Sequence, residues 1–99
     1  MNSEFDEYQM EQIKLGISQG LDVSIYTKPE FTDGQMWYIR LGLEKGLDVH
    51  MYAKPEFDEE QMEEIFKGLE EGVDASLYAK SELSREQMKR IRLGLLYGH

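Results

Sequence analysis

Three aspartates, Asp22, Asp48 and Asp74, recur at intervals of 26 residues. Of all the residues in the chain, their type and spacing come closest to a metal-binding pattern. Carboxylate oxygens are the ligands that hard divalent cations prefer, so a ladder of these groups could hold metal ions. Each aspartate, however, stands just before a short apolar segment, where it can cap a short helix. Equivalent side chains of a repeat also lie about one repeat apart. We therefore expect no metal site and no cofactor.

Few other residues could support catalysis. The chain has no cysteine, which excludes disulfides, thiolate metal sites and thiolate catalysis. His50 stands where the neighbouring copies of the pattern have Ser24 and Ser76, and His99 is the last residue. No serine has a histidine and a carboxylate at a spacing typical of nucleophilic catalysis. We expect a protein that is not an enzyme and has no small-molecule substrate.

These residues belong to a unit of 26 residues that repeats along the chain. The copies occupy residues 5–30, 31–56 and 57–82, and a truncated copy occupies residues 83–99. A fixed period of this length is typical of repeat proteins, in which one supersecondary unit packs on the next. The sequence predicts a single all-α domain over 1–99. It would be a helical repeat array, either α-solenoid-like or compact and right-angled, with four long helices alternating with three short helical turns.

Each copy begins with signals that start a helix. An apolar residue precedes Asp, Thr or Ser, and Gln-Met begins three residues after that polar residue. The polar residue and the glutamine form a capping box, while the apolar residue and the methionine form a hydrophobic staple. The four starts are Phe5-Asp6…Gln9-Met10, Phe31-Thr32…Gln35-Met36, Phe57-Asp58…Gln61-Met62 and Leu83-Ser84…Gln87-Met88.

Each long helix is expected to run for about 13 residues and to end at a glycine in the left-handed conformation. These glycines are Gly20, Gly46, Gly72 and Gly98. In the complete copies an apolar residue and then an aspartate follow, which predicts a Schellman turn and the N-cap of a short helix. The short helices are expected over residues 23–26, 49–52 and 75–78.

One arc of about 120° around each long helix holds the residue types that recur among the copies, and the opposite arc holds those that vary. An interior glycine recurs on this arc (Gly16, Gly42, Gly68, Gly94), which indicates that another backbone comes close there. The long helices are predicted to contribute a core of Met10, Ile13, Ile17, Met36, Ile39, Leu43, Met62, Ile65, Leu69, Met88, Ile91 and Leu95. The short helices should add Val23, Val49, Tyr26, Tyr52 and Tyr78.

The net charge of −9 disfavours direct binding to nucleic acid, because phosphates would be repelled. No apolar run approaches the roughly 20 residues of a membrane span, and the amino terminus is acidic, unlike a signal peptide. We therefore expect no membrane contact and a cytoplasmic location.

Aromatic residues interrupt the variable arc in the second copy. Trp37 and Tyr38 stand where the other copies have Glu11-Gln12, Glu63-Glu64 and Lys89-Arg90, and Leu41 lies one turn further on. Trp and Tyr are common anchors of protein interfaces. The short helices could instead cover this arc within the molecule, or a second copy or a foreign protein could bind it. The candidate protein-binding residues are Trp37, Tyr38, Leu41, Phe66, Leu96 and Tyr97.

Charge is unevenly distributed among the copies, with −7 in the third and +3 in the last. Glu63 and Glu64 could pair with Lys89 and Arg90 if the helices stack in register, and the same contrast could drive head-to-tail association. A solvated charged face is the simpler alternative. The acidic third copy could also imitate a nucleic-acid backbone and inhibit a DNA- or RNA-binding protein.

The pattern F-x3-QM-x2-IR-x-GL-x2-GLDV-x2-YA-x-P resembles a tandem repeat in uncharacterised proteins of gut anaerobic bacteria. In the second copy it is carried by Gln35, Met36, Ile39, Arg40, Gly42, Leu43, Gly46, Leu47, Asp48, Val49, Tyr52, Ala53 and Pro55. The resemblance implies a bacterial source and an all-helical repeat, and it supplies no catalytic residues. We expect a non-enzymatic interaction module or scaffold whose partner is another protein or a second copy.

Overall fold

The structure is a computed structural model that describes residues 4–98. Within this range the chain is all-helical, as predicted, and contains no strand. Residues 1–3 and His99 lie outside the described residues, and with them the two ends of the predicted domain and the end of the last copy. The elements are α1 (Glu7–Ser18), η1 (Val23–Ile25), α2 (Asp33–Glu44), η2 (Val49–Met51), α3 (Glu59–Glu71), η3 (Ala75–Leu77) and α4 (Arg85–Tyr97), where η denotes a 3₁₀-helix.

All four α-helices begin with the predicted capping box. The cap side chain accepts a hydrogen bond from the backbone N–H of the glutamine, and the glutamine side chain accepts one from the backbone N–H of the cap. This exchange satisfies two of the backbone donors that a helix start leaves unpaired. The caps are Asp6, Thr32, Asp58 and Ser84.

The helix ends also follow the prediction. The four glycines after the helices have φ between 72° and 80°, a region that other residues rarely adopt. In the complete copies the next backbone N–H donates to the carbonyl of the interior glycine, as in a Schellman turn. Asp22 and Asp74 cap the 3₁₀-helices through their side chains, but Asp48 makes no such bond. His50 stands in place of the serine that follows the other two caps.

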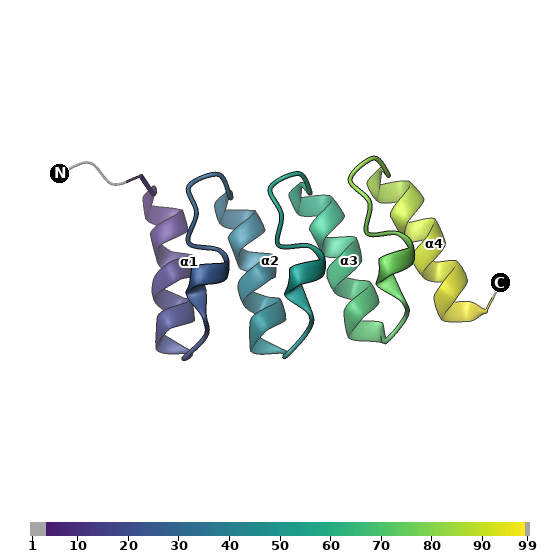
Figure 1. The fold of residues 1–99 in the computed structure, drawn as a ribbon, viewed down its shortest axis with the longest axis horizontal. Coiled ribbons are helices and arrows are strands. Elements are labelled where there is room, and N and C mark those ends of the chain that lie inside the picture. Colours follow the sequence, from purple (N-terminus) through teal and green to yellow (C-terminus); the bar gives the residue numbers. More distant parts are fainter. Residues whose placement is uncertain (1–3, 99) are drawn as a thin grey trace.

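The long helices lie side by side in chain order, and the same helix–turn–short helix unit recurs three times in the same orientation (Figure 1). α1 contacts α2, α2 contacts α3, and α3 contacts α4, while each 3₁₀-helix packs on the long helix before it. The described chain measures 53 × 26 × 16 Å, so the row of helices is long and thin. No helix within residues 4–98 is long and apolar enough to cross a bilayer.

Three tyrosines from the ends of the 3₁₀-helices hold this unit together. Tyr26, Tyr52 and Tyr78 have no exposed surface, and each hydroxyl donates to a backbone carbonyl in the long helix of its own copy, at 2.6–2.7 Å. A Cβ at the interior glycines Gly16, Gly42 or Gly68 would collide with the same hydroxyl. The short helix is therefore the element that comes close at these glycines, but the prediction of a close backbone is wrong, because a tyrosine side chain occupies that space.

Most of the predicted core is buried or half-buried, but Ile17 and Leu95 are wrong. Ile17 is 61% exposed and Leu95 is 37% exposed. The equivalent residues Leu43 and Leu69 are half-buried in α2 and α3, which have a neighbouring helix on both sides. Among the described residues α1 has no helix before it and α4 has no short helix after it. Ile17 and Leu95 therefore each lack a neighbouring element that Leu43 and Leu69 have.

Candidate functional site

Successive long helices meet at three contacts, which we call seams: α1–α2, α2–α3 and α3–α4. At each seam a residue from the middle of the later helix contacts the residue 28 positions earlier in the chain. The three seams use different chemistry at the same sequence offset. The pairs are Gln12–Arg40, Tyr38–Phe66 and Glu64–Arg92.

The α1–α2 seam is a polar contact between an arginine and two amides. Arg40 is buried, and its Nε donates to Oε1 of Gln12 at 2.8 Å. Its second contact is to Oε1 of Gln19 at 3.1 Å, 21 positions earlier. Glu44, one turn along α2, lies 3.6 Å from the same guanidinium. The buried guanidinium of Arg40 therefore has two hydrogen-bond acceptors, and the exposed Glu44 carboxylate is its counter-charge.

The α2–α3 seam is aromatic. Phe66 is 7% exposed, and its ring centroid lies 6.1 Å from that of Tyr38 with the planes tilted by 56°. On the other side of Tyr38, Trp37 lies 4.8 Å away in an edge-to-face arrangement at 88°. Such geometries are the favoured ones for aromatic pairs. Burial, together with the nearby Glu63 carboxylate, raises the pKa of the Tyr38 phenol. The three rings thus run from the core out to solvent.

The α3–α4 seam is ionic. Arg92 is 5% exposed and donates to the fully buried Glu64 at 2.9 Å and to Glu71 at 2.8 Å. Burial alone would lower the pKa of Arg92, but the two carboxylates outweigh it and raise the pKa. Oε2 of Glu64 has no hydrogen-bond partner, although Arg85 lies 3.7 Å away. The stability of this seam therefore depends on keeping both charges together.

The acidic residues of the third copy pair with different basic residues from those predicted. Glu63 and Glu64 contact Arg85, and Glu64 also contacts Arg92, whereas Lys89 and Arg90 make no ion pair among the described residues. The prediction was wrong because it aligned equivalent helix positions, whereas the helices meet at positions that are offset around the helix. Lys89 and Arg90 instead lie exposed on α4.

The six candidate binding residues fall into two separate places. Phe66 is buried and contacts Tyr38 at the α2–α3 seam, while Tyr38 and Leu41 are half-buried against the core. Trp37 remains 39% exposed beside them. Leu96 and Tyr97 lie at the end of α4, with exposed fractions of 36% and 66%. α3 separates the two places (Figure 1).

Trp37 lies on the side of α2 that the 3₁₀-helix does not cover. It stands about 140° around the helix from Gly42, which contacts Tyr52. Equivalent positions in the other helices carry Glu11, Glu63 and Lys89. We call Trp37, with the edges of Tyr38 and Leu41, the Trp37 surface.

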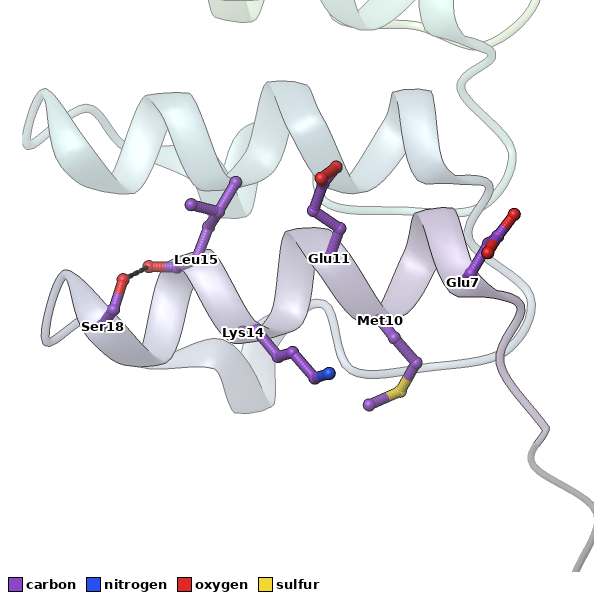
Figure 2. Close-up of a pocket in the computed structure, with 6 residues that line it drawn as sticks. All are labelled: Glu7, Met10, Glu11, Lys14, Leu15 and Ser18. Atoms are coloured by element: carbon purple, nitrogen blue, oxygen red, sulfur yellow. Dashed lines mark hydrogen bonds between the residues drawn. The ribbon is translucent and has the colours of Figure 1, made fainter.

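No described side chains are arranged as a metal site, since no group of three His, Asp or Glu residues converges within residues 4–98. A shallow hollow on α1 is lined by carboxylates, a lysine and apolar groups, and the Ser18 hydroxyl there donates to the carbonyl of Leu15 at 2.8 Å (Figure 2). A second hollow lies beside the start of α3. In the second hollow the Thr32 hydroxyl donates to the Glu59 carboxylate at 3.0 Å.

Sequence reasoning missed the register of the seams and a second role of the recurring glutamine. The Nε2 group of Gln35 donates to the carbonyls of Pro55 at 3.4 Å and Phe57 at 2.6 Å, so the residue ties one copy to the next as well as capping α2. Gln9 and Gln61 repeat the arrangement. The seam register could have been found from matched residue chemistry 28 positions apart, as in Tyr38 and Phe66.

No protein-family model, curated protein or solved structure matches this chain. The resemblance to a bacterial tandem repeat stays a prediction, and the site must be interpreted from its own geometry.

Proposed function

We propose that this protein is a non-enzymatic interaction module that binds another protein through the Trp37 surface. The observation that carries the proposal is the exposure of Trp37, at 39%, on the side of α2 away from the 3₁₀-helix. A buried tryptophan would need no partner, and an exposed one at this site contributes little to the packing of the seam.

The geometry supports a function in binding because the Trp37 ring is held in place. Tyr38 packs against its ring edge to face, and Tyr38 is itself fixed by the buried Phe66. A rigid aromatic anchor loses little conformational entropy when it binds, which is why such residues dominate many interfaces. An exposed aromatic ring of this kind would favour a partner with an apolar pocket.

The wider proposal is that the chain forms a small α-solenoid-like scaffold. Three seams of different chemistry on one geometry support this interpretation, because nearest-neighbour contacts are the basis of solenoid folds. A bacterial source and a cytoplasmic location belong to the same proposal, the first from the resemblance of the repeat.

The alternative, an acidic mimic of nucleic acid, receives less support from the structure. Arg85 and Arg92 engage several carboxylates of the third copy, and Lys45 pairs with Glu70 at 3.1 Å. Internal pairing reduces the charge that is free to occupy a basic groove. The mimic therefore has only part of the acidic surface that the sequence suggests.

Partner recovery with matched variants tests the proposal. Trp37→Glu gives α2 the residue found at the same position in α1 and α3, and Glu11→Gln is a control at the equivalent exposed position of α1. We expect a partner protein to be retained by the wild type and by the control, and lost with Trp37→Glu. Binding that survives Trp37→Glu but is lost in high salt would favour the mimic instead.

A further inference from the structure

The two ends of the helix row expose faces that the inner helices use for packing. The hollow on α1 is lined by Glu7, Met10, Glu11, Lys14, Leu15 and Ser18. Lys14 is equivalent to Arg40, Phe66 and Arg92, the residues that contact the preceding helix at each seam. Met10 and Lys14 point away from α2 (Figure 2). The face of α1 that a preceding helix would cover is therefore open.

The corresponding face of α4 is open at the other end. Arg90 and Tyr97 are equivalent to Glu64 and Glu71, which receive the arginine of the next helix at the α3–α4 seam. Both are exposed, Tyr97 by 66%. Lys89, beside them on α4, is exposed as well and makes no ion pair among the described residues. This face combines unpaired positive charge with an exposed aromatic ring.

Charges on the two open faces are complementary in the register of the existing seams. At the α3–α4 seam Arg85, the first residue of α4, lies 3.2 Å from Glu60, 3.7 Å from Glu63 and 3.7 Å from Glu64. On the open faces Glu7 is equivalent to Arg85, while Lys89 and Arg90 are equivalent to Glu63 and Glu64. The signs of these three residues are reversed, so attraction is preserved among them, whereas Glu86, which is equivalent to Glu60, keeps its negative charge.

A second contact repeats in the same register. The Thr32 hydroxyl donates to the Glu59 carboxylate at 3.0 Å across the α2–α3 seam. Ser84 is equivalent to Thr32, and Glu7 is equivalent to Glu59. A hydroxyl and a carboxylate would therefore face each other again if α1 followed α4.

We propose that copies of this chain associate head to tail, with α1 of one copy docked on α4 of another so that the seam register continues. The interface is separate from the Trp37 surface, so the proposal goes beyond partner binding and can fail independently of it. Met10, which lines the hollow, contributes apolar area from α1, and Tyr97 contributes it from α4.

Two pairs in this register are mismatched. Glu7 would face Glu86, which takes the position of Glu60. Lys14 takes the position of Arg92 and would face Arg90, which takes the position of Glu64. This repulsion makes the association weak and concentration-dependent. It also supplies a gain-of-function test, because Lys14→Glu would recreate an opposite-charge pair at that position.

Sedimentation equilibrium over a range of protein concentrations tests the proposal, at about 0.1 M salt so that the net charge is screened beyond about 10 Å. The wild type is expected to associate as concentration rises. Glu7→Lys should weaken association several-fold, since its attraction to both Lys89 and Arg90 becomes a repulsion while only the repulsion from Glu86 is relieved, and Lys14→Glu should strengthen it several-fold. Glu30→Lys, which makes the same charge change in an exposed loop, should have no effect.

A charge-swapped chain makes the test specific. Adding Lys89→Glu and Arg90→Glu to Glu7→Lys should restore association, and circular dichroism should show that every variant keeps its helices. A wild type that stays monomeric at all concentrations would overturn the proposal. Association that is insensitive to Glu7→Lys but lost with Trp37→Glu would overturn it too, since copies would then meet through the Trp37 surface.

Discussion

The tyrosine at the end of each 3₁₀-helix explains a glycine that would otherwise weaken the fold. Gly42 lies inside α2, where glycine costs about 0.5–1 kcal/mol relative to alanine. The Tyr52 hydroxyl and the Val49 side chain occupy the space that a Cβ would need. In return Tyr52 loses all exposure and bonds to the carbonyl of Tyr38 at 2.6 Å.

Replacing this glycine should therefore destabilise the protein despite the better helix propensity of alanine. We expect Gly42→Ala to lower the free energy of unfolding by about 1–3 kcal/mol, the usual cost of overpacking. Urea denaturation followed by circular dichroism measures the change. Combining it with Tyr52→Phe, which removes the colliding hydroxyl, should cost less than the sum of the two single variants. Simple additivity would contradict the proposed collision.

Burial of the Tyr52 phenol also predicts sensitivity to alkali. Burial raises its pKa above the usual value of about 10, so the folded chain keeps a proton that the unfolded chain releases. This contribution to stability is complete below about pH 10 and is lost as pH rises above it, at about 1.4 kcal/mol per pH unit for one tyrosine.

This linkage is tested by measuring the unfolding midpoint at a series of pH values from about 8 to about 11, about one pH unit apart. The wild type should lose stability above about pH 10, and Tyr52→Phe should show a shallower loss because one titrating phenol is gone. Parallel pH profiles for the two proteins would show that Tyr52 does not contribute.

At the scale of elements, the recurring glutamine joins each helix to the copy that follows. Gln35 makes the capping bond and also donates to the carbonyls of Pro55 and Phe57. Gln87 makes the capping bond but is exposed and has no such carbonyl contacts among the described residues. Gln87 is therefore a control within the same chain for the contacts that Gln35 makes to the following copy.

We expect Gln35→Ala to lower the free energy of unfolding by about 2–4 kcal/mol. The carbonyls of Pro55 and Phe57 lose their hydrogen-bond donor, and the backbone N–H of the cap loses its acceptor. Gln87→Ala should cost about 0.5–1 kcal/mol, the value of a capping interaction alone. Chemical denaturation of both variants gives the comparison. Equal losses would mean that the contacts to Pro55 and Phe57 contribute nothing to stability.

The seams should be interchangeable if they share one geometry. Arg92→Phe alone leaves Glu64 buried without its counter-charge and should cost about 3–5 kcal/mol. Adding Glu64→Tyr reproduces the Tyr38–Phe66 pair at the α3–α4 seam and should recover most of that loss. Denaturation of the single and double variants measures the coupling. A double variant no more stable than Arg92→Phe would show that the seams differ in geometry.

Local signals made the helices predictable from sequence, while the seams were not predictable in the same way. The cap Thr32 and the glycine Gly46 act through neighbours a few residues away, so their roles can be inferred from spacing alone. The contact of Glu64 with Arg92 depends on how far one helix is rotated against the next, which the repeat period does not specify. Lys89 and Arg90 were therefore assigned to the wrong contact.

The candidate site was only partly predictable for the same reason. Trp37 and Phe66 both differ from the residues at the same positions in the other copies, so both were predicted from the sequence to bind a partner. The structure separates them, since Phe66 is 7% exposed and Trp37 is 39% exposed. The two positions stand about 60° apart around the helix, Phe66 in a seam and Trp37 at its exposed edge.

At the scale of the whole molecule, the fold uses one face of each helix for the 3₁₀-helices and two sides for its neighbours. What remains is an outer face whose residues change among copies, and the exposed faces at the two ends of the row. The proposed functions use these remainders. Partner binding uses the outer face at Trp37, and self-association uses the ends.

The most direct test of the central claim compares the unfolding free energies of Trp37→Glu and Phe66→Arg, each of which introduces a residue found at that position in sister copies. If Trp37 serves binding rather than folding, its replacement should cost about 1–2 kcal/mol, since part of the ring and one aromatic contact are lost. Phe66→Arg should cost about 3–5 kcal/mol, because a core ring is removed. A loss from Trp37→Glu as large as that from Phe66→Arg would show that Trp37 belongs to the core and would contradict the proposed interaction surface.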